Sequence, residues 1–280
     1  MKYCVSGLGG FLGSHLKRML EKQEVVGISQ KLLYSPNELK EFFEKEKPDY
    51  IIHLAAFGNH AKQQDVAMIV FSNLIGTYNM LSASKDIPYK KFIQVGSSSE
   101  YGRKDYPMSE SDLPEATTFY GASKVGATYL AKAFAVVKPV VIVRPFSVYG
   151  EDEADFRFIP TIIKTMITGK QMLLDPNPTH DWIYVEDFIS GMLMAAEYAK
   201  PGEIVNIGTG REHTNLQILE TLQRISGKQA KYKPSVLRDF DNTHWCADIK
   251  KLLSYGWKQK YPLGLGLART YEWFKGKYVQ

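Results

Sequence analysis

The stretch KYCVSGLGGFLGSHL, residues 2–16, decides the fold. It begins with an apolar run, and Gly7, Gly10 and Gly13 then follow with the spacing G-x-x-G-x-x-G before a helical pattern. Glycine permits a tight turn, lets a pyrophosphate approach the backbone amides, and leaves the positive end of a helix dipole facing that anion. This order predicts a dinucleotide-binding site. The expected cofactor contacts here are Gly7, Gly10, Phe11, Leu12 and Gly13.

Outward from this stretch, short apolar runs alternate with helical patterns as far as Arg144. Such alternation is typical of βαβ units, which build a parallel sheet covered by helices. The number of runs predicts five or six parallel strands. The expected strands lie at residues 2–6, 25–28, 50–54, 92–95 and 140–143, and the expected helices at 11–22, 36–46, 69–84 and 120–135.

Beyond Arg144 the alternation loosens. The patterns predict helices at 159–168 and 185–199, a strand at 204–207, and then short helices and loops that end in an aromatic-rich helix at 267–274. The fold class is therefore α/β: a doubly wound Rossmann sheet with a smaller, mostly helical C-terminal substrate-binding region. Residues 1–146 and about 181–208 are assigned to the Rossmann domain, and 147–180 and 209–280 to the second region.

Composition and charge narrow the class of protein. A chain of 280 residues with 44% hydrophobic residues can bury a large core. Its 35 Lys plus Arg and 30 Asp plus Glu give a net charge of +5 without a basic block, so we expect no nucleic-acid partner. Cys4 and Cys246 form no metal-ligand pair, and we predict no metal site. We see neither a signal peptide nor a long apolar run, and expect a cytoplasmic protein with no membrane partner.

The end of the second expected strand bears on the choice of dinucleotide. An NAD site usually has Asp or Glu there, which accepts a hydrogen bond from the ribose 2′-hydroxyl. This chain has Ser29, Gln30 and Lys31 instead. A hydroxyl and an ammonium group suit a 2′-phosphate. The sequence therefore favours NADP(H), with NAD(H) as the alternative.

Tyr120 and Lys124 stand four residues apart in FYGASK. On a helix this spacing places the phenol and the ammonium on one face. A neighbouring cation favours the phenolate, so we expect Lys124 to lower the pKa of Tyr120 from its usual value of about 10. Such a phenol can serve as acid or base near neutral pH. Three serines precede it in VGSSSEYG: Ser97, Ser98 and Ser99.

Together these motifs resemble the extended short-chain dehydrogenase/reductases, the group of nucleotide-sugar epimerases, dehydratases and reductases. The resemblance covers essentially the whole chain. Its further motifs occur in order: IIHLAA at 51–56, SNLIGTYNML around Asn73, RPFSVYG at 144–150, HDWIYVEDF at 180–188 and LRDFDN around Arg238. The resemblance implies a soluble enzyme that binds a nicotinamide cofactor and a nucleoside-diphosphate sugar.

The resemblance also implies roles for single residues. Its catalytic set is matched by Asn73, a serine, Tyr120 and Lys124. An ungapped comparison makes the serine Ser97, whereas one missing residue before Tyr101 would make it Ser98. Further cofactor contacts are Leu54, Ala55, Ala56, Tyr120 and Lys124, with His53 packed nearby at a strand end. Expected substrate contacts are Ser98, Ser99, Arg144, Ser147, His180 and Arg238, of which Arg238 is the better candidate for the diphosphate and Arg144 the more frequent structural anchor.

Three reactions are common in the group. Dehydratases resemble one another in having acidic residues directly after the catalytic Thr, where this chain has Ser98 and Ser99, although a gapped comparison would let Glu100 serve. Epimerases usually have the acid that is missing near Ser29. The favoured prediction is therefore NADPH-dependent reduction of a nucleotide-activated 4-keto-6-deoxysugar. The alternatives are a 4-epimerase, a 4,6-dehydratase and, from another class, a catalytically silent NADP(H)-binding sensor.

Two further expectations concern the oligomeric state of the protein and the role of three acidic residues. In the family, the helices equivalent to 69–84 and 120–135 often pair across a dimer axis, so a homodimer is expected by analogy. The acids Asp181, Glu186 and Asp187 are interpreted as a solvated helix start and not as metal ligands.

Overall fold

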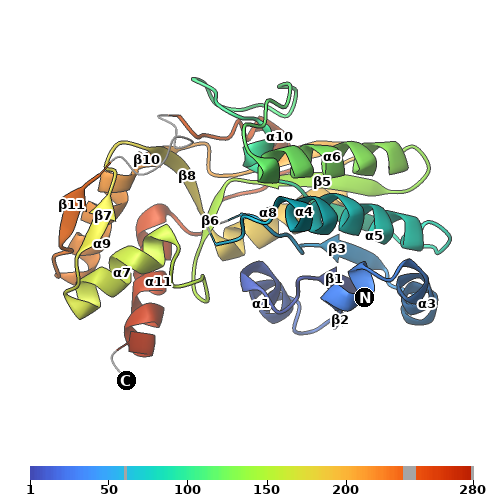
Figure 1. The fold of residues 1–280 in the computed structure, drawn as a ribbon, viewed down its shortest axis with the longest axis horizontal. Coiled ribbons are helices and arrows are strands. Elements are labelled where there is room, and N and C mark those ends of the chain that lie inside the picture. Colours follow the sequence, from blue (N-terminus) through green and yellow to red (C-terminus); the bar gives the residue numbers. More distant parts are fainter. Residues whose placement is uncertain (60–61, 236–243, 279–280) are drawn as a thin grey trace.

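The computed structural model describes residues 1–59, 62–235 and 244–278. A six-stranded sheet lies at its centre, with the strand order β2-β1-β3-β4-β5-β9 (Figure 1). The strands are β1 (Lys2–Ser6), β2 (Glu24–Ile28), β3 (Tyr50–His53), β4 (Lys91–Val95), β5 (Val140–Pro145) and β9 (Ile204–Ile207). Every neighbouring pair is parallel, so the expected doubly wound α/β sheet is confirmed.

Both faces of this sheet are buried under helices, which explains the continuous apolar runs of its strands. Cys4, Ile51 and Phe92 face one helical layer, whereas Val5 and Ile52 face the other. The first layer consists of α3 (Pro36–Glu46), α5 (Gly76–Ser84) and α6 (Phe119–Phe134), and the second of α1 (Phe11–Met19) and α8 (Val185–Tyr198). A short helix, α2 (Gln30–Leu33), which the sequence did not indicate, follows β2 directly.

The helix expected at 69–84 begins earlier and is not a uniform α-helix. It consists of α4 (Val66–Val70), a π-helical segment η1 (Phe71–Ile75) and α5, and the Asp65 carboxylate caps it by accepting from the Met68 N–H at 3.1 Å. By length and composition Val66–Ser84 could cross a membrane, contrary to our expectation that no such run exists, but 50% of that stretch is buried inside the fold. A core helix passes the same test of hydropathy.

The C-terminal region contains more strands than its sequence indicated. β6 (Ser147–Tyr149), β8 (Thr179–Tyr184) and β10 (Glu212–Thr214) form one small sheet, and β7 (Met172–Leu174) pairs with β11 (Tyr232–Pro234). The remaining helices are α7 (Phe158–Thr168), α9 (Asn215–Ser226), α10 (Lys250–Ser254) and α11 (Leu263–Tyr278). Figure 1 shows α7, α9 and α11 beside these short strands, apart from the central sheet. Because α8 and β9 return to that sheet, the two regions share one continuous core.

Candidate active site

The glycine turn after β1 leaves no space for side chains at two of its positions. Gly7 has φ +74°, and a Cβ there would lie 2.9 Å from the Ala55 nitrogen. A Cβ on Gly13 would lie 2.3 Å from the Gly7 oxygen. The Gly10 N–H closes the turn by donating to that same oxygen at 3.0 Å. The backbone of the loop at Ala55 therefore packs directly against Gly7 of the turn.

The outer side of the turn is open backbone. A Cβ on Gly9 would meet nothing within 4 Å, and within the described chain no side chain caps the start of α1 at Gly10. Phe11 and Leu12 begin the helix and pack inward against the core. A concave glycine backbone at an uncapped helix start is the cradle that a pyrophosphate requires. The residues present therefore fit a nicotinamide dinucleotide.

At the ribose end, Ser29 and Lys31 are both exposed beside the carboxyl end of the edge strand β2. The Ser29 hydroxyl caps α2 by accepting from the Leu32 N–H at 3.3 Å. Its own proton therefore stays available to a ligand, and Lys31 adds a positive charge at the second position of the same short helix. The position carries no carboxylate.

The ends of β1, β3 and β4 form the floor of the site. Ser6 Oγ lies 2.5 Å from His53 Nδ1 and accepts from the Ala55 N–H at 3.2 Å. Lys124 Nζ donates to the Val95 carbonyl at 2.6 Å. Burial lowers the pKa of Lys124 to about 8, with the charge of Glu100 opposing that shift. Burial and the neighbouring Lys124 lower the pKa of His53 to about 3, so the imidazole is neutral.

Tyr120 and Ser97 are brought together. The Thr118 hydroxyl caps α6 by accepting from the Gly121 N–H at 3.0 Å, which places Tyr120 in the first turn. Ser97, 8% exposed, lies beside the phenol of Tyr120 and acts to lower its pKa. Its Oγ also accepts from the Ser99 N–H at 3.1 Å. Ser97 is therefore the serine of this run that lies beside the Tyr120 phenol, whereas Ser98 pairs with the Trp245 indole.

The expectation that Lys124 lowers the pKa of Tyr120 is wrong for this structure. Burial raises the pKa of Tyr120, while the hydrogen bond from Ser97 and the charge of Arg157 act against that shift. Lys124 directs its ammonium to the Val95 carbonyl and is itself only 2% exposed. The phenol is consequently protonated at neutral pH.

Asn73 braces the site. Its side chain accepts from the Phe57 N–H at 2.9 Å and donates to the Phe57 carbonyl at 2.8 Å and to Ser123 Oγ at 2.9 Å. Ser123 in turn donates to the Tyr120 carbonyl at 2.7 Å. Asn73 thus ties the loop after β3 to the catalytic helix. Sequence reasoning missed Ser123, although it lies inside FYGASK, one turn after Tyr120.

Arg144 does not reach a substrate surface. It is 2% exposed, and its Nε and Nη2 donate to Glu100 Oε2 at 2.9 and 2.7 Å. The other oxygen of Glu100 accepts from the Ser97 N–H at 2.8 Å. The substrate contact expected for Arg144 is therefore not supported. Because Glu100 is fully engaged by Arg144 and Ser97, it is also not free to act as a dehydration acid.

The remaining substrate candidates divide into three groups. Ser147 and His180 come together across β6 and β8, with Ser147 Oγ 3.4 Å from His180 Nδ1. Ser98 is buried and accepts from the Trp245 indole N–H at 3.1 Å, and Ser99 is partly buried beside it. Arg238 lies outside the described residues. Trp245 was missed because nothing in the sequence links it to Ser98.

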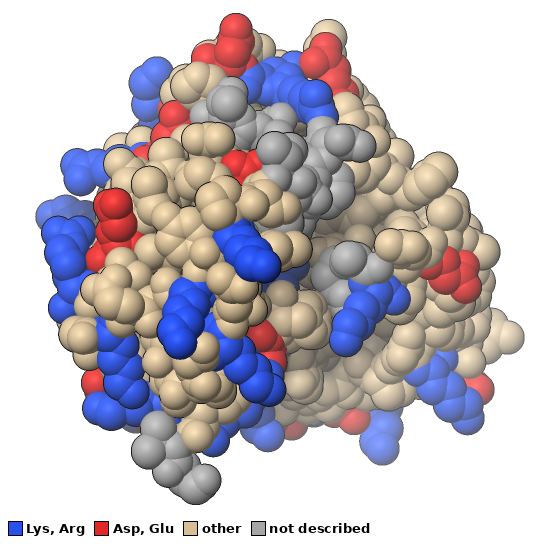
Figure 2. All heavy atoms as spheres, turned by 60° about the vertical axis from the view of Figure 1, so that its left-hand side comes forward, with Lys and Arg blue, Asp and Glu red and all other residues tan. Residues whose placement is uncertain are grey.

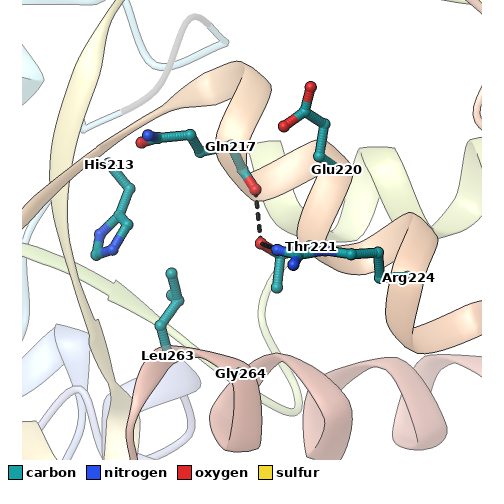
Figure 3. Close-up of a pocket in the computed structure, with 7 residues that line it drawn as sticks. All are labelled: His213, Gln217, Glu220, Thr221, Arg224, Leu263 and Gly264. Atoms are coloured by element: carbon teal, nitrogen blue, oxygen red, sulfur yellow. Dashed lines mark hydrogen bonds between the residues drawn. The ribbon is translucent and has the colours of Figure 1, made fainter.

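A pocket of about 380 Å³ lies elsewhere, between β10, α9 and α11 (Figure 3). Figure 3 shows His213 facing one side of α9 across the pocket, with Leu263 and Gly264 below. Its lining comprises His213, Gln217, Glu220, Thr221, Arg224, Leu263 and Gly264. None of these is a residue that the sequence assigned to catalysis, so this pocket is not the active site. Figure 2 shows one hollowed face of the molecule, over which basic side chains are widely spread.

A Rossmann sheet with a glycine turn, and with serine, tyrosine and lysine gathered at its strand ends, defines the extended short-chain dehydrogenase/reductases. The profile of the NAD dependent epimerase/dehydratase family matches residues 3–208. The chain therefore belongs to this family of nucleotide-sugar enzymes.

Relatives within the family catalyse different reactions. The UDP-glucuronate 4-epimerase of Thermodesulfobacterium geofontis is 31% identical over 317 residues, covering 98% of this chain and 96% of that protein. The dTDP-glucose 4,6-dehydratase of Haemophilus influenzae is 24% identical over 332 residues, covering 98% of both. The UDP-glucuronic acid 4-epimerase from Bacillus cereus, in complex with UDP-glucuronic acid and NAD, has a TM-score of 0.89 at 29% identity, covering 99% of this chain and 100% of that one.

Proposed function

We propose that the protein uses NADPH to reduce the C4 ketone of a nucleotide-activated 4-keto-6-deoxysugar. One observation carries the proposal: the carboxylates that the competing reactions use are missing or engaged. Ser29 and Lys31 stand at the ribose end of the cofactor site, where NAD enzymes have an acid. Beside Ser97, the only carboxylate in the SSSE run, Glu100, is held by Arg144.

The glycine turn, Ser29, Lys31, Ala55 and Lys124 would hold the dinucleotide, which when bound supplies a hydride to C4. Tyr120 gives its proton to the oxygen of the former ketone. This requires a protonated phenol at neutral pH, which the raised pKa of Tyr120 provides. Solvent then restores the proton.

Ser97 and Asn73 support this proton transfer. Ser97 lies beside the phenol and would hold the sugar oxygen in line with it. Asn73 keeps the first turn of the catalytic helix in place through Ser123. Ser147 and His180, which lie together across β6 and β8, are proposed to contact the nucleotide sugar, and Arg238 stays the proposed diphosphate contact.

A 4-epimerase is the second candidate, because UDP-glucuronate 4-epimerases match nearly the full length of the chain. That reaction needs the same tyrosine, serine and lysine, but it needs the phenol to accept a proton first. It also needs the oxidised cofactor to stay bound, since the hydride returns to the same carbon. The two candidates therefore differ in the resident cofactor and in net consumption of NADPH.

The test is NADPH oxidation by the purified protein, supplied in turn with GDP-, dTDP-, CDP- and UDP-linked 4-keto-6-deoxyhexoses. We expect turnover with one of these nucleotides and its loss in Tyr120→Phe. The dinucleotide released on denaturation is identified in parallel. NAD retained through purification, interconversion of UDP-sugars and no oxidation of NADPH would favour the epimerase. Bound NADP(H) without any turnover would favour the silent sensor.

We further infer a cytoplasmic homodimer. Large apolar side chains are exposed along α4, η1 and α5 and on α6, where the family analogy places the partner: Val66, Val70, Phe71, Ile75, Tyr78, Phe119 and Tyr129. A charge introduced by Tyr78→Lys should then dissociate the dimer. Sedimentation that gives the same monomeric mass for both proteins would contradict it.

A further inference from the structure

The segment between β6 and α7, residues 150–157, connects parts of the molecule that are distant in sequence. In Figure 1 it runs between α1 and α11. Two side chains of α1 contact it. The Arg18 guanidinium pairs with the Asp152 carboxylate at 2.8 Å, and both side chains are partly exposed. The second contact, made by His15, is buried.

His15 binds the backbone of this segment. Its Nε2 lies 2.7 Å from the Glu151 carbonyl oxygen, and the residue is 4% exposed. A carbonyl oxygen only accepts, so Nε2 carries a proton and donates it. Burial lowers the pKa of His15, which keeps the imidazole neutral at neutral pH. The hydrogen bond therefore joins two neutral groups and is enclosed by protein.

Packing alone does not explain an imidazole at this position. The buried residues of α1 are Gly13, His15 and Leu16, and burying a polar ring costs free energy unless its N–H is paired. The Phe11 ring packs edge to face against the imidazole, with the ring centroids 5.5 Å apart. Phe11 is the first residue of α1, directly after the glycine turn. His15 thus connects the proposed pyrophosphate-binding end of α1 with Glu151.

Glu151 is bonded in turn to the strands that carry the proposed nucleotide-sugar contacts. It follows β6, the strand of Ser147, by two residues. Tyr184, the last residue of β8, donates its hydroxyl to the Glu151 carboxylate, 2.7 Å from Oε1 and 2.6 Å from Oε2. The same strand carries His180. A continuous line of contacts therefore runs from the start of α1 through His15 and Glu151 to β6 and β8.

We propose that His15 is a positioning residue that fixes α1 to β6 and β8 through Glu151, so that the dinucleotide and the nucleotide sugar strengthen each other's binding. A ligand that orders α1 lowers the cost of ordering these strands for the other ligand, and the effect is reciprocal. The inference rests on the proposed function only in placing a dinucleotide at the glycine turn and a nucleotide sugar beside Ser147 and His180.

The test measures the affinity for NADPH by fluorescence titration, with and without a saturating nucleoside diphosphate. The nucleotide is whichever of GDP, dTDP, CDP and UDP binds most tightly. In wild type it should raise the affinity for NADPH by about fivefold or more. His15→Leu should bring this factor close to one, whereas His15→Gln, whose amide N–H reaches toward the same carbonyl, should keep most of it. Arg18→Met, which breaks the exposed contact of the same helix, should leave the factor unchanged.

Tyr184→Phe provides a variant that leaves α1 untouched. It frees the Glu151 carboxylate from β8 and should lower the factor to an intermediate value, and it decides the question if His15→Leu does not fold. The inference would be overturned by a wild type without coupling, or by unchanged coupling in the folded variants among His15→Leu and Tyr184→Phe. Intact coupling without oxidation of NADPH would sink the proposed reduction alone.

A second readout needs no nucleotide sugar. Hydrogen exchange of the backbone amides is followed with and without saturating NADPH. In wild type the cofactor should slow exchange both in the glycine turn and in residues 151–157. His15→Leu should keep the protection of the turn and lose that of the segment. Equal protection of the segment in the two proteins would mean that His15 does not transmit the effect.

The dinucleotide itself is kept separate from this comparison by the glycine turn. Protection of the turn in both proteins shows that NADPH is bound in each, so a difference in residues 151–157 reports the connection through His15 and not the presence of the cofactor.

Discussion

The strand ends of the central sheet and the segment between β6 and α7 hold pairs of charges in different ways. At the strand ends, Glu100, Arg144 and Lys124 are at most 2% exposed and are fixed by short contacts. In the segment between β6 and α7, Asp152 pairs with an Arg18 side chain that is 54% exposed, and Asp155 with a Lys277 side chain that is 44% exposed. Exposed pairs contribute roughly 0 to 1 kcal/mol each, whereas breaking a buried pair costs several.

This difference separates the residues proposed for catalysis from pairs at the protein surface. Proton transfer requires groups in fixed positions. The buried contacts at the strand ends fix Glu100, Arg144 and Lys124, although burying charged groups lowers the free energy of unfolding. The segment between β6 and α7 is joined to α1 and α11 by partly exposed ion pairs. If the strand ends are the more strongly constrained region, substitutions there should change activity and the free energy of unfolding more than substitutions of the exposed pairs.

The largest effect should come from Tyr120→Phe. Removing the proton donor is expected to lower kcat by about 10²- to 10⁴-fold with little change in stability. Ser97→Ala should leave more residual activity, because Tyr120 remains as the donor. The matched control is Tyr129→Phe, an exposed tyrosine on the same helix. Wild-type kcat in Tyr120→Phe would remove Tyr120 from the mechanism.

Breaking the buried ion pair should have the next largest effect. Arg144→Met leaves the Glu100 carboxylate buried without its cation, which typically costs about 3 to 5 kcal/mol of the free energy of unfolding. Arg18→Met, which breaks the exposed pair with Asp152, should cost no more than about 1 kcal/mol. Urea denaturation measures both. Equal losses of unfolding free energy in the two variants would contradict the difference between the buried pair and the exposed pair.

Burial of the Lys124 ammonium should lower the free energy of unfolding at neutral pH. Its pKa falls from 10.5 in the unfolded chain to about 8 in the fold, so between these values the unfolded state binds more protons and wild-type stability rises with pH. Lys124→Met should therefore be more stable than wild type at pH 7, by up to about 3 kcal/mol.

The advantage of Lys124→Met should shrink as pH rises from about 8 toward 10.5. Urea denaturation of both proteins across this window gives the difference directly. An advantage that does not change with pH would mean that burial of the ammonium is not its cause.

Substitution in the glycine turn should have the smallest effect on stability, together with a local effect on dinucleotide binding. A Cβ at position 13 would lie 2.3 Å from the Gly7 oxygen, so Gly13→Ala should cost about 1 to 3 kcal/mol and weaken dinucleotide binding. Gly9→Ala meets nothing within 4 Å and should leave stability nearly unchanged. Thermal unfolding and fluorescence titration with NADPH and NADH measure both. Equal losses in the two variants would show that the turn is not packed as described.

Much of the Rossmann half could be predicted from the sequence. The strands near residues 25–28, 50–54 and 92–95 and the helix at 36–46 were predicted within about one residue, because their apolar periodicity is a local property. The five short strands of the C-terminal region could not be found. Each of them has three to six residues and pairs with a segment far along the chain.

The site divides in the same way. The spacing of the three glycines, of Tyr120 from Lys124, and of the serine run depends on neighbours along one segment, and the sequence by itself determined these features. Three features depend instead on contacts between residues 23 to 44 positions apart: the serine that lies beside the phenol, the direction of the Lys124 ammonium, and the pairing of Arg144 with Glu100. Only the tertiary structure decided them, because burial and charge pairing arise when strand ends from different βαβ units converge on one edge of the sheet.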